Sequence, residues 1–274
     1  MGHTHLRQLR GRTVNVRAFR AGPLLVFCLS SCLLPTVRVG AQTRLPSHPD
    51  DLLRMDPAGF AGLLETARPT PLSTDARAVI LASLPTQGEV TELDALALQK
   101  LGAVREVLRT AGRHRVFEVR IIDVKQATIG LHARMVLLIT KPAVDLLRAE
   151  GLQAMVAHEI GHEYVWVEYE GVSMLGDHER AKELELICDA IGIVILHQLG
   201  INTSWLIAGL EKVARFNRER LGVALNENAY PTPSRRREYA RAVGEWVARI
   251  GCLNDLNGPP CPRDRRRGTR AHGC

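Results

Sequence analysis

The chain has 274 residues, 46% of them hydrophobic and 24% charged, which excludes a wholly disordered protein because there is enough apolar side chain to bury a core. It contains no run of 18 or more uncharged apolar residues, which argues against a membrane protein with several spans. The net charge is +7, but residues 1–41 hold six arginines and no acid, and the segment 263–270 holds five arginines and one acid, so residues 42–262 carry a net charge of −3. A mildly acidic body with basic ends does not indicate a nucleic-acid partner.

Residues 1–41 are typical of an export signal. A basic start leads into the apolar run 23–34, which is too short to span a bilayer comfortably. Val39, Gly40 and Ala41 then supply the short side chains that a signal peptidase reads, so we expect cleavage after Ala41 and a periplasmic, cell-envelope or secreted location. In an alternative interpretation, residues 29–32 form a lipobox and a lipidated Cys32 attaches the protein to a membrane; a third alternative is an uncleaved anchor.

Residues 42–112 are predicted to be a helical N-terminal region. Prolines divide residues 42–72 into pieces that fit short helices, for example 58–66. Longer helices are expected over 74–84 and 90–111, the second because its apolar residues recur with helical spacing.

Strand patterns follow at 117–124 and 135–140, with a turn and a returning strand between them. Further helices are predicted to begin near Pro142 and to cover 150–167, 178–199, 203–220 and 235–250. A loop with Gly171 and Gly176 is expected to separate the second of these helices from the third.

The tail 251–274 is rich in Gly, Pro and Arg and is predicted to be disordered. Cys252 and Cys261 flank a turn-rich segment, and export permits a disulfide between them; free thiols are the alternative.

The strongest chemical signal is the pentapeptide His158-Glu159-Ile160-Gly161-His162 inside a predicted helix. Histidines four residues apart project from one helix face, so both imidazoles can reach one tetrahedral zinc ion. Glu159 is poorly placed to be a third ligand but can take a proton from a zinc-bound water molecule. The pattern predicts one zinc ion per chain, with Glu159 as the catalytic base.

A third ligand is expected from a second helix. Position 168 is Glu168, so the pattern that places a third histidine six residues after the motif fails. Glu185 and Asp189 lie four residues apart among apolar neighbours, and a buried pair of carboxylates is costly without a cation. We therefore expect Glu185 to bind the metal and Asp189 to hold a ligating histidine; Glu183 is the fallback ligand, although it has no aspartate four residues later.

With these motifs in order, the chain resembles the M48 peptidases, gluzincins that include the HtpX-like and CAAX-prenyl proteases. The resemblance runs from about residue 117 to 237 and rests on the strand pair, the segment 151–162 and the Glu185-x-x-x-Asp189 spacing. It implies that residues 113–250 form an α+β, zincin-like peptidase domain, with a small antiparallel sheet beside the active-site helix and a mostly helical remainder. It also implies the roles assigned above to His158, Glu159, His162, Glu185 and Asp189.

The chain departs from the family pattern at Gln126-Ala127, where members usually have Asn-Ala before the edge strand, and at a candidate site residue near the final helix. Members often carry a His-Pro pair a few residues before an arginine near the final helix, and this chain has Tyr230-Pro231 there, followed by three arginines at 235–237. A tyrosine hydroxyl can still donate to an oxyanion, so Tyr230 is a candidate oxyanion donor; a structural tyrosine at a loop–helix junction is the alternative.

These features predict an exported zinc metalloendopeptidase that acts on a peptide or protein substrate. The alternative is a non-catalytic or weakly catalytic envelope chaperone or assembly factor that retains a structural zinc site. Glu159 argues against the alternative, because a purely structural site needs no base. No feature of the sequence points to a particular oligomeric state.

Overall fold

The computed structural model describes residues 45–84, 88–90, 92–223 and 229–254 of the chain. Within them the fold is α+β and mostly helical, as predicted, with a small three-stranded sheet. The predicted export signal, Cys32, Cys261 and most of the basic tail lie outside the described residues. The N-terminal helices are α1 (Pro49–Arg54), α2 (Pro57–Thr66), α3 (Thr74–Ser83) and α4 (Ala95–Thr110).

Short polar side chains begin three of these helices. Asp56, Ser73 and Asp94 each accept a hydrogen bond from the backbone N–H three residues later, which satisfies a donor that the first helical turn leaves free. Asp94 places the start of α4 at Ala95, five residues later than the apolar pattern predicted. In α4 the buried side chains face α6, whereas α3 has no buried residue.

The sheet has the order β1 (Glu118–Ile122), β3 (Val136–Thr140), β2 (Ile129–His132), so β2 is an edge strand. β2 pairs antiparallel with β3, but β1 pairs parallel with β3, so the sheet is mixed and the prediction of an antiparallel sheet was wrong. The chain does not place β2 directly beside β1. The connection from β1 leaves room for one strand between them, and β3 then occupies that place. The β2–β3 hairpin therefore adds to β1 through its second strand.

The turn of that hairpin is strained. Ala133 and Arg134 have φ values of 47° and 61°, in the left-handed region that residues other than glycine rarely adopt. A hairpin turn with two successive left-handed residues matches the twist of the strands that it joins, and Asn-Gly is the usual pair at these two positions. Ala133 and Arg134 adopt this left-handed backbone conformation although neither alanine nor arginine favours it.

The C-terminal half is helical and follows the predicted order: α5 (Lys141–Leu146), α6 (Ala149–Leu175), α7 (His178–Gln198), α8 (Ser204–Leu221) and α9 (Pro233–Asn254). α6 runs eight residues past the predicted end, through Gly171, and stops only at Gly176, whose φ of 68° is left-handed. The predicted loop with both glycines is therefore a short turn at Gly176 and Asp177. Asp177 then caps α7 by accepting from the backbone N–H of Arg180.

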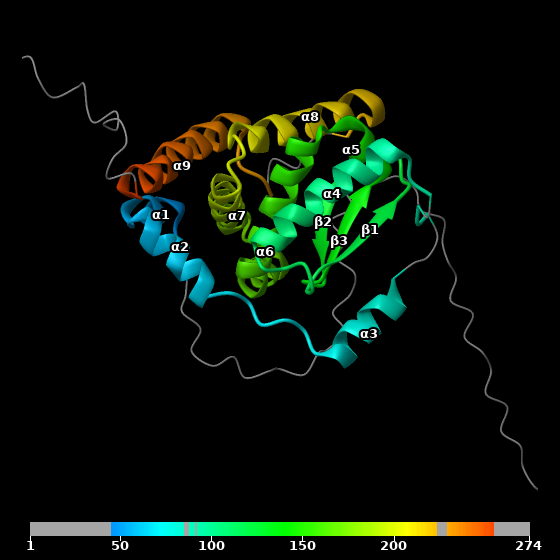
Figure 1. The fold of residues 1–274 in the computed structure, drawn as a ribbon, viewed down its shortest axis with the longest axis horizontal. Coiled ribbons are helices and arrows are strands. Elements are labelled where there is room, and N and C mark those ends of the chain that lie inside the picture. Colours follow the sequence, from blue (N-terminus) through cyan, green and yellow to red (C-terminus); the bar gives the residue numbers. More distant parts are fainter. Residues whose placement is uncertain (1–44, 85–87, 91, 224–228, 255–274) are drawn as a thin grey trace, which may run out of the picture.

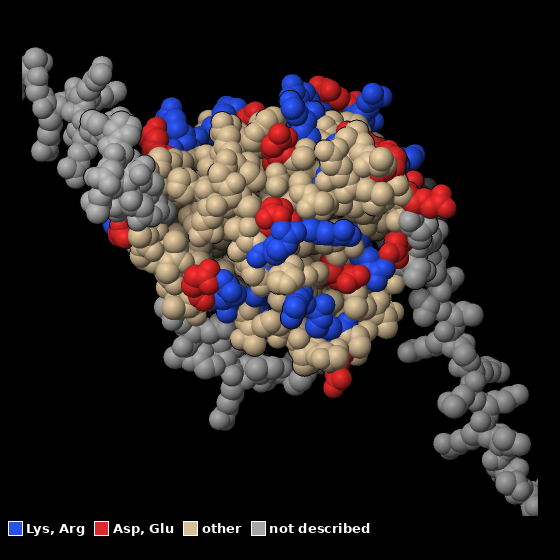
Figure 2. Space-filling view, viewed as in Figure 1, with Lys and Arg blue, Asp and Glu red and all other residues tan. Residues whose placement is uncertain are grey.

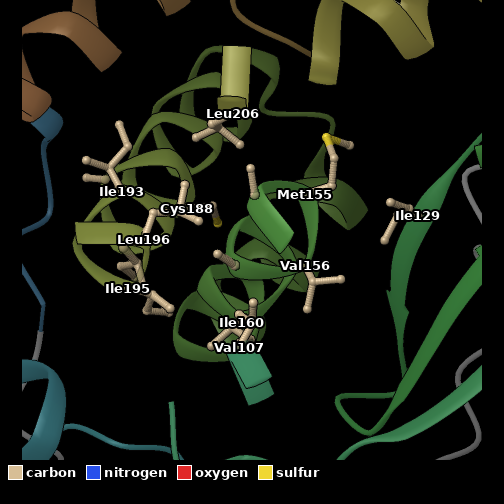
Figure 3. Packing of buried hydrophobic residues seen from close by; sticks show 14 of the residues in the cluster. Val107, Ile129, Met155, Val156, Ile160, Cys188, Ile193, Ile195, Leu196 and Leu206 are labelled. Carbon is tan, nitrogen blue, oxygen red and sulfur yellow. The ribbon is translucent and has the colours of Figure 1, made fainter. Parts of the chain in front are cut away.

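α6 lies between the sheet and α7, and it also contacts α4 and α8 (Figure 1). Figure 3 shows how neighbouring elements surround α6: Val107 of α4, Cys188 of α7 and Ile129 of β2 lie on different sides of it. Because α6 is enclosed in this way, polar residues in its middle are buried as well.

Two glycines bring α6 and α7 unusually close. A Cβ on Gly161 would lie 2.7 Å from the Cα of Cys188, and one on Gly192 would lie 3.0 Å from the backbone nitrogen of His158. These are approaches of backbone to backbone, which a larger residue would obstruct. Near these glycines, side chains that project from α6 toward α7 therefore come into contact with those that project from α7 toward α6.

A buried ion pair joins the segment before β1 to α6. Arg113 Nε donates to Glu163 Oε2 over 2.7 Å, a second guanidinium nitrogen bonds the other carboxylate oxygen, and both side chains are almost fully buried. Arg113 also donates to the carbonyl oxygen of Pro69 over 3.1 Å. This contact fixes the middle of α6 beside His162.

The first helices hold α9 in place. Trp246 Nε1 donates to the carbonyl oxygen of Met55 over 2.9 Å, and the Trp246 ring meets Phe60 edge-on with 5.7 Å between centroids. Tyr239 donates to the carbonyl oxygen of Pro49 over 3.1 Å. Because the start of α9 enters the site described below, these contacts also support the site.

On the face seen in Figure 2, basic and acidic side chains are interspersed among other residues. Among the helices of the described ranges, none is long and apolar enough to cross a membrane.

Candidate metal centre

The two histidines of α6 converge as the helical spacing predicts. His158 Nε2 and His162 Nε2 lie 3.2 Å apart, and the two rings meet edge-on. His158 is 3% exposed. Together with Glu159, these residues form a group whose ligand atoms all lie within 4.8 Å of one another and could hold a metal ion.

Glu185 of α7 completes a triangle of donors. Its Oε2 lies 3.4 Å from His158 Nε2 and its Oε1 lies 3.5 Å from His162 Nε2, with the carboxylate 1% exposed. The fallback ligand Glu183 is elsewhere: its carboxylate pairs with Arg180 over 2.7 Å and with His48 over 3.3 Å. Of the two candidate glutamates, the fold brings only Glu185 to the histidines.

Asp189 lies one turn further along α7 and orients His158. His158 Nδ1 is 2.9 Å from Asp189 Oδ1, an arrangement in which the ring donates through Nδ1 and leaves the Nε2 lone pair for a metal. Asp189 is fully buried. The sequence predicted that Asp189 would hold one of the two histidines, and in the structure that histidine is His158.

Arg236 of α9 is a site residue that the sequence did not single out. It donates to both oxygens of Asp189, over 2.6 and 2.7 Å, and its Nη2 lies 3.4 Å from Glu185 Oε2. This forked contact is the geometry that a guanidinium favours with a carboxylate. Three consecutive arginines at 235–237 were the available signal, but only the position of α9 distinguishes Arg236 from its neighbours.

Glu159 points toward the edge of the sheet. Its Oε2 accepts a hydrogen bond of 2.9 Å from the backbone N–H of Leu131 in β2. β2 pairs with β3 on its other side, so this N–H is on the outer edge of the sheet. The carboxylate is thus held next to the two histidines by the backbone of a strand.

Two of the candidate ligands are in the protonation state that metal binding needs. Burial raises the pKa of Glu159 to about 7 and lowers the pKa of His162 to about 4. Burial opposes ionisation of Glu185 as well, but His162, His158 and Arg236 outweigh it and lower the pKa of Glu185 to about 2. Glu185 is therefore ionised and His162 neutral near pH 7, which is the state in which each binds a metal.

His158 behaves differently from His162. Burial again disfavours the charged ring, yet hydrogen bonds to Asp189 and Glu185 prevail and raise the pKa of His158 to about 10. The metal-free site therefore holds a proton on His158 near Glu185. A metal ion that binds Nε2 would displace this proton, so metal binding and proton release are coupled.

Two tyrosines border the site. Tyr169 of α6 donates to Glu185 Oε1 over 3.2 Å, and its ring meets His162 edge-on with 5.0 Å between centroids. Tyr230 is half-buried before α9, and burial together with the charges of Glu185 and Glu159 raises its pKa. The candidate oxyanion donor Tyr230 is thus close enough to feel the charges of both glutamates. The contact of Tyr169 with Glu185 was not predicted from the sequence.

Cys188, whose side chain the structure describes, takes no part in this group. Cys188 is buried between the helices, and burial raises the pKa of its thiol well above the ordinary value. The predicted pairing of Cys252 with Cys261 falls outside the part of the chain whose side chains are described.

Comparison with models of protein families and with curated proteins returned no match to this chain.

Proposed function

We propose that the protein is a zinc-dependent endopeptidase with a zincin-like active site, of the kind found in the M48 peptidases. The observation that carries the proposal is the triangle formed by His158 Nε2, His162 Nε2 and the Glu185 carboxylate, with sides of 3.2 to 3.5 Å. A buried triangle of metal-binding atoms beside a further carboxylate has the composition of a catalytic metal site.

The size of the triangle supports zinc. Zinc bonds to histidine nitrogen and carboxylate oxygen are about 2.0–2.1 Å long, so two ligands in a tetrahedral site are separated by about 3.3–3.4 Å. The His158–His162 nitrogen separation of 3.2 Å is close to that value, and each of these nitrogens has one Glu185 oxygen at a similar distance, Oε2 at 3.4 Å from His158 and Oε1 at 3.5 Å from His162. Two histidines and one carboxylate also leave a fourth position open, which distinguishes catalytic from structural zinc sites.

When bound, zinc would polarise a peptide carbonyl group and acidify a water molecule. Glu159 would accept the proton of that water and pass it to the leaving amine. In the metal-free site, burial raises the pKa of Glu159 to about 7, so this carboxylate takes up a proton more readily than an exposed glutamate does. Asp189 would keep His158 in the tautomer that binds metal, and Arg236 would keep Asp189 ionised and oriented.

Strand β2 offers a place for a peptide substrate. It is an edge strand, and because Leu131 donates its backbone N–H to Glu159, a peptide would pair with the other outward backbone groups of the strand. A peptide that adds to this edge as a further strand would pass directly in front of the site. Tyr230 would then be a candidate donor to the oxyanion of the reacting carbonyl group.

Zinc analysis and a cleavage assay test this function together. The purified protein should contain about one zinc ion per chain and should cleave members of a peptide library, and a chelator should abolish both. Zinc without cleavage would instead favour the chaperone or assembly factor that retains a structural site. A protein with neither zinc nor cleavage would refute both.

Export is a separate part of the proposal. Residues 1–41 are outside the described residues, so the proposal depends on their basic and apolar pattern. Mass spectrometry of the mature N-terminus would find Gln42 after signal cleavage and a lipid-modified Cys32 after lipoprotein processing. An intact N-terminus on protein confined to the cytoplasm would contradict export.

A further inference from the structure

We propose that Tyr169 is a positioning residue for the metal site, which fixes the carboxylate of Glu185 through its hydroxyl group. The inference rests on the proposed role of Glu185 as a metal ligand. Neither the sequence motif nor the spacing of ligands involves Tyr169, because the tyrosine follows the second histidine by seven residues.

The geometry of α6 places Tyr169 at the site. Seven residues are close to two helical turns, so Tyr169 lies on nearly the same helix face as His162. α6 continues without a break to Leu175, and this extension beyond the predicted helix end is what carries Tyr169 into position. Its ring packs edge-on against His162, with 5.0 Å between centroids and 84° between planes.

Each oxygen of Glu185 has its own donor. Tyr169 donates to Oε1 over 3.2 Å, and Arg236 Nη2 lies 3.4 Å from Oε2. The same two oxygens face different histidines, Oε1 toward His162 and Oε2 toward His158. The two donors therefore hold the carboxylate plane from opposite ends, with one oxygen presented to each histidine.

Loss of the hydroxyl would release one end of this carboxylate. Glu185 is 1% exposed, so solvent cannot readily replace the missing donor at Oε1. The carboxylate would be free to rotate about the contact with Arg236, and the entropy of ordering it would then oppose metal binding. Groups that hydrogen-bond metal ligands typically change metal affinity by about 10–100-fold.

The same helix supplies a matched control. Tyr164 is also partly buried, and its hydroxyl also donates over 3.2 Å, but to the backbone carbonyl of Leu64 in α2. Tyr164→Phe and Tyr169→Phe thus remove the same atom and a hydrogen bond of the same length from one helix. Only the second substitution removes a bond to a proposed metal ligand.

The test is the zinc dissociation constant of the full chain, measured by competition with a chromogenic chelator and without any peptide. Tyr169→Phe should weaken zinc binding about 10–100-fold, and Tyr164→Phe should change it less than about twofold. Cobalt-substituted protein should show a changed visible spectrum for Tyr169→Phe alone, because its bands report ligand geometry. Zinc affinity of Tyr169→Phe within about twofold of wild type, or equal weakening by Tyr164→Phe, would overturn the proposal.

This experiment separates the two proposals. If the wild-type protein binds zinc and Tyr169→Phe weakens it, the role of Tyr169 stands even where no peptide is cleaved and the peptidase function fails. If the wild-type protein cleaves peptides but Tyr169→Phe binds zinc as tightly as the wild type does, the peptidase function stands and the role of Tyr169 is refuted. A wild-type protein that binds no zinc would refute both.

Discussion

Gly161 of α6 faces Cys188 of α7 so closely that a Cβ on the glycine would lie 2.7 Å from the Cα and 2.8 Å from the carbonyl oxygen of the cysteine. This contact sets the distance between the two helices at the level of the site. His162 follows Gly161 on one helix, and Asp189 follows Cys188 on the other. The glycine inside the histidine motif is therefore a requirement of packing, and the packing brings the histidines of α6 to the carboxylates of α7.

The first prediction follows from this contact. Gly161→Ala should lower the free energy of unfolding by about 1–3 kcal/mol or more, because the clash is with backbone that cannot rotate away. Gly171→Ala, on the same helix with nothing within 4 Å, should be neutral or stabilising by up to about 1 kcal/mol. Urea unfolding of the metal-free proteins measures both. Equal effects of the two substitutions would show that the helices are not packed as described.

A second prediction concerns the histidines. His158→Ala and His162→Ala should each lose stoichiometric zinc, because each removes one vertex of the donor triangle. His178→Ala removes an exposed histidine at the start of α7 and should retain the metal. Metal analysis after gel filtration makes the comparison, and zinc retained by a His158/His162 double variant would place the metal elsewhere.

The choice of the third ligand gives a third prediction. Glu185→Ala should weaken zinc binding strongly, whereas Glu183→Ala should leave it unchanged, because Glu183 instead pairs with Arg180 and His48. Asp189→Asn should have an intermediate effect of about 10–100-fold. Zinc titration of the three variants decides the assignment, and release of metal by Glu183→Ala alone would reverse it.

Arg236 and Arg237 provide a fourth prediction as adjacent residues with different roles. Arg236→Ala removes the buried partner of Asp189 and should cost about 3–5 kcal/mol of unfolding free energy in the metal-free protein. Arg237→Ala breaks an exposed pair with Glu211 and should change stability by no more than about 0.5 kcal/mol. Similar unfolding curves for the two variants would argue that the Arg236 contacts do not stabilise the fold.

Local patterns in the sequence predicted most of the helices and which candidate site residues share a helix face. The four-residue spacings of His158 with His162 and of Glu185 with Asp189 each fix a helix face, and both pairs lie together in the structure. The apolar neighbours of Glu185 also indicated its burial, which the structure confirms. These features depend on one helix at a time, so a sequence can reveal them.

The features that the sequence did not reveal depend on contacts between distant segments. Arg236 is distinguished from Arg235 and Arg237 only by where α9 crosses α7, and Tyr169 only by the continuation of α6 past the predicted end. The parallel pairing of β1 with β3 depends on the path between strands, which alternation of side chains does not encode. The export signal stays a prediction.

The fifth prediction concerns Glu159, the proposed base of a zinc peptidase. Glu159→Gln keeps the size of the side chain and an oxygen that can still accept from Leu131, so fold and bound zinc should be preserved. Peptide turnover should fall by about 10²–10⁴-fold, the scale of a lost general base. Glu183→Gln, which changes a glutamate outside the donor triangle, is the control and should cleave as the wild type does.

The decisive measurement is the rate of peptide cleavage by wild type and Glu159→Gln, each loaded with one equivalent of zinc and compared at equal concentration. We expect equal zinc content and equal unfolding curves for the two proteins, with loss of cleavage in Glu159→Gln alone. Cleavage by Glu159→Gln at the wild-type rate would contradict this expectation.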